Sequence, residues 1–163
     1  MDGVPCSDSR STLVRWMGVI DTNNAGFVHG GTVMRLCDEA AAIAAIRHAR
    51  MRVVTAGVDR MTFLEPVELG DLVTFKASVN AVWRTSMEVG VRVEAEKPRT
   101  RTSRHTSSAY ITMVALDADG RPAAMPPLLT ECGADLRRER EAQTRRHNRL
   151  AERDQLRSER VDG

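Results

Sequence analysis

An aspartate interrupts the most apolar helix that the sequence predicts. Residues 30–48 are mainly Val, Met, Leu, Ile and Ala, and Asp38 lies in their midst. The residues three and four positions away from Asp38 are apolar except for Arg35, which can instead pair with Glu39. A buried carboxylate without a partner is costly or has a raised pKa, and a raised pKa suits a general base. The pattern leaves two interpretations of Asp38: a general base, or a structural carboxylate held by a backbone N–H or by Arg35.

Two glycines stand at the beginning of the same helix. Helix N-termini carry free N–H groups and partial positive charge, and Gly30 and Gly31 let a ligand approach that backbone. A thioester carbonyl there would find an oxyanion hole, although the glycines can also simply form a turn and allow close packing. His29 can cap the helix or pack against it. Asn23 lies in a turn that favours asparagine, and its amide can hold a water or a carbonyl oxygen.

Other catalytic patterns find no support in the sequence. It has no GxSxG motif, P-loop or dinucleotide fingerprint, and its four histidines lack the spacing of metal ligands. The three cysteines are scattered and odd in number, which suits a reducing compartment and argues against structural zinc. We therefore predict neither a metal site nor a cofactor.

Length and charge restrict the possible classes of protein. A chain of 163 residues is most simply one domain, and a net charge of +2 gives no global attraction to nucleic acid. The polar N-terminus resembles no signal peptide, and the longest apolar run, residues 40–46, is too short to span a bilayer. We expect a soluble cytoplasmic protein that binds neither nucleic acid nor membranes.

The order of the predicted elements points to one helix enclosed by an antiparallel sheet. Apolar periodicity predicts a helix from about 30 to 48, and alternation of β-branched residues predicts strands at 12–19, 53–64, 71–84, 86–96 and 106–116. Consecutive strands form an antiparallel sheet, and the single apolar helix must be what that sheet wraps. Residues 99–108 are expected to form a basic, polar loop.

Both ends of the chain are predicted to lie outside this domain. Residues 1–11 are expected to be disordered, residues 12–130 to form the domain, and residues 131–163 to form a charged helical or disordered tail. The tail has too few large apolar residues to bury much surface. A solvated or frayed helix is one interpretation, and an arm that binds RNA or a partner is the other; the near balance of acids and bases disfavours RNA.

Three stretches resemble the hotdog-fold acyl-CoA thioesterases, especially the cytosolic acyl-CoA hydrolases and their bacterial relatives. They are "DTNNAGFVHGGTVMRLCDEAAAIAAIRHA" (21–49), "VVTAGVDRMTFLEPVELGDLVTFKASV" (53–79) and "WRTSMEVGVRVEAE" (83–96). The resemblance extends from about residue 13 to 127. It implies an α+β hotdog fold, in which an antiparallel sheet wraps one long central helix, here with a charged C-terminal helical extension. It also implies a homodimer with a continuous sheet and two sites at the interface, or a hexamer built as a trimer of dimers.

The resemblance also assigns roles to the residues at the site. Asp38 matches the helix carboxylate that acts as a general base, or as a nucleophile in some relatives. Gly30 matches the glycine whose N–H polarises the thioester carbonyl. Asn23 matches the asparagine of the site loop, contributed by the partner subunit. A strand hydroxyl that positions water in a related branch corresponds to Thr55, although Gly57 is the alternative aligned position.

Further residues are expected to contact the substrate. His29 and Gly31 adjoin the catalytic glycine, and the corner formed by Arg84, Thr85 and Ser86 lies near coenzyme A in relatives. Arginine suits phosphate groups, so Arg101 and Arg104 are predicted to meet those of coenzyme A.

The resemblance implies hydrolysis of an acyl-CoA thioester to a carboxylic acid and coenzyme A, with Asp38 activating water. Coenzyme A would then be part of the substrate. The alternative function is a hotdog domain that senses acyl-CoA without cleaving it, and retention of Asn23 and Asp38 argues against it.

Overall fold

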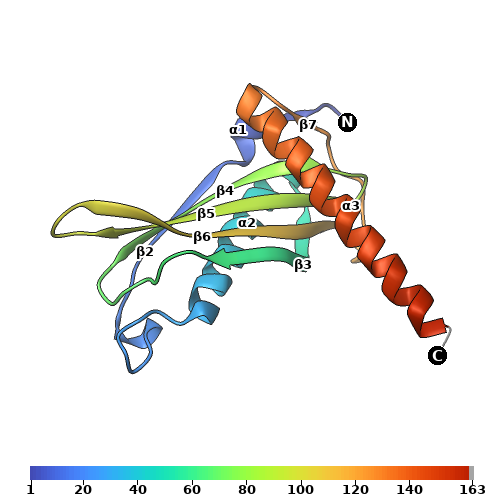
Figure 1. Ribbon diagram of the computed structural model, residues 1–163. Coiled ribbons are helices and arrows are strands. Elements are labelled where there is room, and N and C mark those ends of the chain that lie inside the picture. Colours follow the sequence, from blue (N-terminus) through green and yellow to red (C-terminus); the bar gives the residue numbers. More distant parts are fainter. Residues whose placement is uncertain (162–163) are drawn as a thin grey trace.

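The protein contains a five-stranded antiparallel sheet with the strand order β2-β4-β5-β6-β3 (Figure 1). The structure is a computed structural model that describes residues 1–161 of the chain. Its strands are β2 (Ser11–Trp16), β3 (Arg52–Phe63), β4 (Leu72–Val82), β5 (Ser86–Lys97) and β6 (Thr102–Leu116). Neighbours along the chain, β4, β5 and β6, are neighbours in the sheet because tight turns join them. The predicted strand order along the sequence is therefore confirmed.

Helix α2 (Gly30–Ala49) lies against one face of this sheet (Figure 1). Its buried alanines, among them Ala40, Ala41 and Ala44, allow close approach to inward-facing strand residues such as Phe75 and Val89. Arg50 follows in the left-handed conformation, with φ 52°, and ends the helix. The sheet and α2 enclose the core, as the sequence predicted.

The helix is less enclosed than its composition suggested. Met34, Ile43 and Ile46 are 45%, 43% and 49% exposed, so no part of residues 1–161 covers this side of α2. Val54 and Val58 of the edge strand β3 are exposed as well. A single chain therefore leaves one side of the helix exposed, although the sheet was expected to wrap it.

The C-terminal segment is a helix that packs on the opposite face of the sheet. Helix α3 (Gly133–Val161) crosses that face diagonally (Figure 1). Its Ala142 is fully buried, and Arg145 donates two hydrogen bonds to the buried Glu88 of β5. The expectation of a solvated tail is wrong for the first half of this helix, because polar contacts together with the small buried Ala142 attach it to the sheet.

The N-terminal segment is ordered, contrary to expectation. Strand β1 (Val4–Pro5) pairs in parallel with β7 (Leu128–Leu129), and α1 (Cys6–Ser9) follows directly. Ser9 is buried, and its hydroxyl accepts a hydrogen bond from Val79 N–H of β4 at 3.0 Å. The polar composition concealed this docking, because the segment is held by hydrogen bonds to other parts of the chain.

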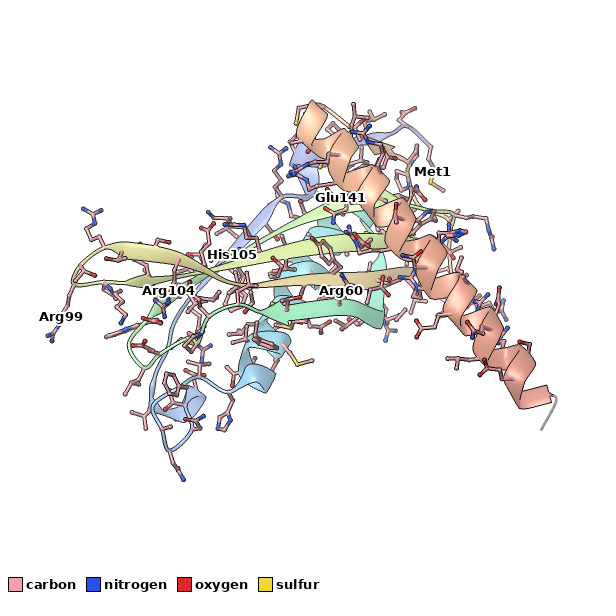
Figure 2. All side chains as sticks on the ribbon, viewed as in Figure 1. Met1, Arg60, Arg99, Arg104, His105 and Glu141 are labelled. Atoms are coloured by element: carbon pink, nitrogen blue, oxygen red, sulfur yellow. The ribbon has the colours of Figure 1, made fainter. Side chains whose placement is uncertain are left out.

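Residues 99–108 form a hairpin rather than the predicted loop. Strand β6 begins at Thr102 and pairs with β5 from Lys97 onward, so the β5–β6 hairpin projects beyond the core (Figure 1). Figure 2 shows Arg99 at its tip and Arg104 and His105 nearer its base. Polar residues can form the tip of this hairpin because residues 99–103 are exposed there and gain their structure from pairing with β5.

Candidate active site

Asp38 of α2 and Thr55 of β3 are in direct contact. The Thr55 hydroxyl donates a hydrogen bond to Asp38 Oδ1 at 2.5 Å, a distance typical of a strong bond to a carboxylate. Asp38 is half-buried rather than enclosed. The expectation of a buried carboxylate without a partner is therefore wrong: the partner comes from a strand 17 residues further along the chain.

An irregularity in β3 surrounds the hydroxyl that meets Asp38. The register between β3 and β6 shifts between Thr55 and Gly57, and again between Val58 and Arg60. Such bulges change the direction of side chains on the bulged strand. Of the two positions that the sequence left open, Thr55 carries the hydroxyl beside Asp38, while Gly57 lies beyond the bulge without a side chain.

The residues beside Asp38 on α2 do not compete for its role. Arg35 pairs with Glu39 on the exposed side of the helix, which is the less demanding of the two arrangements considered. Cys37 is fully buried, and burial together with the charge of Asp38 raises the pKa of its thiol to about 12. Cys37 is thus a protonated packing residue and not a nucleophile.

The start of α2 presents free backbone donors beside an apolar groove. Within α2 the first N–H groups that make backbone hydrogen bonds are those of Thr32 and Val33, so among the described residues the N–H groups of Gly30 and Gly31 donate none. A groove of about 390 Å³ adjoins Gly30. A side chain at position 30 would point at the Phe63 ring, which lies 3.5 Å from the place of its Cβ. Glycine here keeps the groove open to the helix terminus.

The groove includes residues that the sequence did not single out. It is lined by Val28, Gly30, Val33, Phe63, Leu64, Glu65, Pro66 and Val67. These residues come from the loop before α2, the first turn of α2, and the last residue of β3 with the segment that follows it. No spacing in the sequence marks them as a group, because only the fold brings the three segments together.

His29 and Asn23 flank this helix terminus without contacting Asp38. His29 is exposed at the N-cap of α2, and its side chain makes no capping hydrogen bond. Asn23 Oδ1 accepts hydrogen bonds from Ala25 N–H at 2.9 Å and Phe27 N–H at 3.2 Å. Asn23 therefore shapes its own turn within the chain, and its amide NH₂ points away from these bonds.

The corner at Arg84–Ser86 lies at the same end of the sheet as Thr55 but two strands away. Thr85 O accepts a hydrogen bond from Ala115 N–H at 3.1 Å, which fixes the corner against β6. Two strand spacings are about 10 Å, so this corner does not touch the Asp38–Thr55 pair. Its contact with coenzyme A stays a prediction.

The arginines predicted to meet phosphates differ in their surroundings. Arg104 donates a hydrogen bond to the buried carboxylate of Asp71 at 2.6 Å and lies 3.6 Å from Glu65. Its guanidinium is already compensated by two acids, which removes the basis for its predicted phosphate role. Arg101 is exposed in the β5–β6 turn, with φ 56°.

Gly30 and Asp38 of one chain are too far apart to act on one carbonyl group. They are eight residues apart in a continuous helix, which corresponds to about 12 Å along the axis. A thioester carbonyl, its oxyanion donor and the attacking water must lie within hydrogen-bond reach of one another. On each protomer, the oxyanion donor Gly30 and the carboxylate of Asp38 therefore belong to two separate places.

Comparison with known proteins identifies the family. The thioesterase superfamily matches residues 25–102. An acyl-CoA hydrolase from Staphylococcus aureus, solved with butyryl coenzyme A and coenzyme A, is 32% identical with a TM-score of 0.88, and the match covers 95% of this chain and 94% of that one. The chain belongs to the thioesterase superfamily. This thioesterase has the hotdog fold, and the predicted enzyme class, a thioester hydrolase, is confirmed.

Two further relatives differ from each other in assembly and in chain length. A hexameric acyl-CoA thioesterase structure is 34% identical, with a TM-score of 0.90 and coverage of 93% of this chain and 97% of that one. The cytosolic acyl coenzyme A thioester hydrolase of Rattus norvegicus is 34% identical over 141 residues, which is 85% of this chain but 37% of that protein. None of the described helices is long and apolar enough to cross a membrane.

The staphylococcal enzyme has also been solved as three alanine variants. They replace an asparagine, an aspartate and a threonine, which are separated by 15 and 17 positions. Asn23, Asp38 and Thr55 have the same residue types and the same two separations here.

Proposed function

We propose that this thioesterase hydrolyses acyl-CoA to a free carboxylic acid and coenzyme A, with Asp38 as the general base. The observation that carries the proposal is the 2.5 Å hydrogen bond from Thr55 to Asp38. This bond joins Asp38 and Thr55. Both residues have the same type and the same separation as the aspartate and the threonine replaced in the staphylococcal acyl-CoA hydrolase variants. The substrate class rests on that relative, which was solved with butyryl coenzyme A.

The proposed chemistry uses each group for one task. Asp38 takes a proton from water while the water oxygen bonds to the thioester carbon, and Thr55 holds the Asp38 carboxylate in position. The carbonyl oxygen gains negative charge, which the Gly30 N–H at the helix terminus stabilises. The carbon–sulfur bond then breaks, and the proton held by Asp38 passes to the coenzyme A thiolate. His29 and Gly31 border the carbonyl, while Arg84, Thr85 and Ser86 contact coenzyme A.

The site is shared between two protomers in this proposal. The separation of about 12 Å between Gly30 and Asp38 is bridged if one protomer supplies Asn23 and Gly30 and the other supplies Asp38 and Thr55. Strand β3 is an edge strand beside the exposed apolar side of α2, so pairing of two β3 edges would cover both. We therefore propose at least a homodimer, and a trimer of dimers accords with the hexameric relatives.

Thiol release from a panel of acyl-CoAs tests the activity. We expect turnover for at least one chain length, followed with a thiol reagent on the purified full-length protein. Coenzyme A binding without thiol release across the panel would overturn hydrolysis and favour the acyl-CoA sensor.

Subunit complementation tests the shared site. Asp38→Asn and Asn23→Ala are each expected to be inactive as pure oligomers. A mixed dimer, formed by unfolding and refolding both together, contains one site with intact Asp38 from one chain and intact Asn23 from the other. We expect activity to return in the mixture, because about half of the dimers then hold one intact site. No recovery, with mixed dimers demonstrated by differently tagged chains, would place Asn23 and Asp38 of one chain in the same site.

A further inference from the structure

A second cleft lies on the face of the sheet opposite α2. It has a volume of about 500 Å³, within the range of small-molecule sites, and is formed by strands β4 to β6, the first turns of α3 and the segment leading into β2. Figure 2 shows Glu141 on α3 where that helix passes β4 and β5. The sheet therefore separates this cleft from the Asp38–Thr55 pair on the α2 side.

The walls of the cleft concentrate positive charge. The cationic side chains that line it come from four segments of the chain: Arg10, Lys76, Arg92, Arg137 and Arg138. Glu141 is the one acid among the lining residues. Beyond the lining, Glu94 is shared by Lys76 and Arg92, and Asp135 is shared by Arg10 and Arg138. One carboxylate for two cations leaves the cleft positive, although the chain as a whole carries only +2.

The cleft also borders a buried polar group with an unused acceptor. Asn80 is 3% exposed and lines the cleft, and its Nδ2 donates a hydrogen bond to Glu88 at 3.0 Å. A carboxylate only accepts, so this bond fixes the orientation of the amide. Among the described residues Asn80 Oδ1 has no hydrogen-bond partner, and Arg138 Nε, also at the cleft, has none there either. Buried polar atoms of this kind are normally satisfied.

A glycine maintains the position of this asparagine. A Cβ at Gly90 would lie 2.6 Å from Asn80 Nδ2, so any larger residue would displace the amide. Tyr110 adds apolar surface to the same cleft. Cations around the cleft, an oriented acceptor and apolar surface are the components of a site for an organic anion.

We propose that this cleft binds a small organic phosphate of the nucleoside diphosphate type. Its phosphates meet Arg92 and Arg137, since arginine suits phosphate oxygens. A hydroxyl or amino group of its organic part donates to Asn80 Oδ1, and inorganic pyrophosphate has no organic part to supply that donor. The cleft lies over β4 and β5, away from the β3 edge, so pairing of β3 edges leaves it accessible.

Calorimetric titration of the full-length protein with ADP and with inorganic pyrophosphate tests the proposal at low ionic strength. We expect ADP to bind more tightly than pyrophosphate. The double variant Arg92→Gln and Arg137→Gln is expected to weaken ADP binding by at least about tenfold, because two charge-assisted hydrogen bonds are lost. The matched control, Arg140→Gln with Arg157→Gln, removes the same charge from α3 outside the cleft and is expected to change the affinity less than about twofold.

The variant Asp38→Asn distinguishes the catalytic site from this cleft. We expect it to abolish hydrolysis and to leave ADP binding unchanged. Three results would each overturn the proposal: no ADP binding, ADP binding insensitive to the cleft variant, or pyrophosphate binding as tightly as ADP. Loss of thioesterase activity in the acyl-CoA panel would refute the proposed function without touching this cleft.

Discussion

Two carboxylates on opposite sides of the sheet have opposite surroundings. Glu88 of β5 is fully buried, accepts two hydrogen bonds from Arg145 at 2.9 and 2.7 Å and a third from Asn80 at 3.0 Å. Asp38 of α2 is half-buried and accepts one hydrogen bond, from Thr55. Arg145 also lies 3.7 Å from the centre of the Tyr110 ring, which fixes it further. A carboxylate surrounded by donors is a structural anchor, whereas one with a free oxygen can accept a proton from water.

The difference is one of charge compensation. Removing Glu88 from water is tolerated because a guanidinium and an amide replace its hydration. The partner of Asp38 is a neutral hydroxyl, which does not neutralise the negative charge of the carboxylate. Asp38 can therefore still accept a hydrogen bond or a proton from a bound water. The comparison predicts loss of activity at one carboxylate and loss of stability at the other.

The largest effect is expected from Asp38→Asn. Asparagine preserves the size of the side chain and cannot act as a base, so kcat/KM should fall by roughly 10³-fold, within the usual range for general bases. Thermal unfolding of the same variant should stay close to wild type. Glu39→Gln, one residue further along α2 and on its exposed side, is the control and should retain full activity. Full activity of Asp38→Asn would show that the base is another residue.

A smaller but clear effect on stability is expected from Glu88→Gln. The change leaves the partly buried Arg145 without its carboxylate partner, and breaking a pair whose carboxylate is fully buried typically costs about 3 kcal/mol. Urea unfolding should report this loss, and the kcat/KM of the folded variant should stay within about twofold of wild type. An activity loss at unchanged stability would mean that the two sides of the sheet are coupled and that the comparison fails.

Thr55→Val is expected to have the smallest of the three effects. Valine keeps the branched shape and removes the hydroxyl that orients Asp38, so we expect kcat to fall by about tenfold, the equivalent of one hydrogen bond. Thr55→Ser keeps the hydroxyl and should keep most of the activity. Equal losses in both variants would instead indicate packing against Met113, whose sulfur lies 3.5 Å from the hydroxyl oxygen.

Much of the fold could be predicted from local pattern. The apolar run from Gly30 predicted α2 to within a residue of its end at Ala49, and alternation placed β3 to β5 within a few residues. These elements bury side chains at regular intervals, so their periodicity is written into the sequence. The first residues of β6 (102–105) and the segments β1 and α1 were missed because their residues are mostly polar and gain their structure from pairing with other segments.

The candidate site divides in the same way. The sequence by itself determined that a carboxylate interrupts an apolar helix and that glycines open the helix start, because both are contrasts with neighbouring residues. Only the tertiary structure decided that Thr55 rather than Arg35 is the partner of Asp38, and that α3 brings Arg145 to Glu88. Both contacts join residues distant in the sequence, and the distance between them is set by how the sheet twists and where the helices cross it, which no local pattern contains.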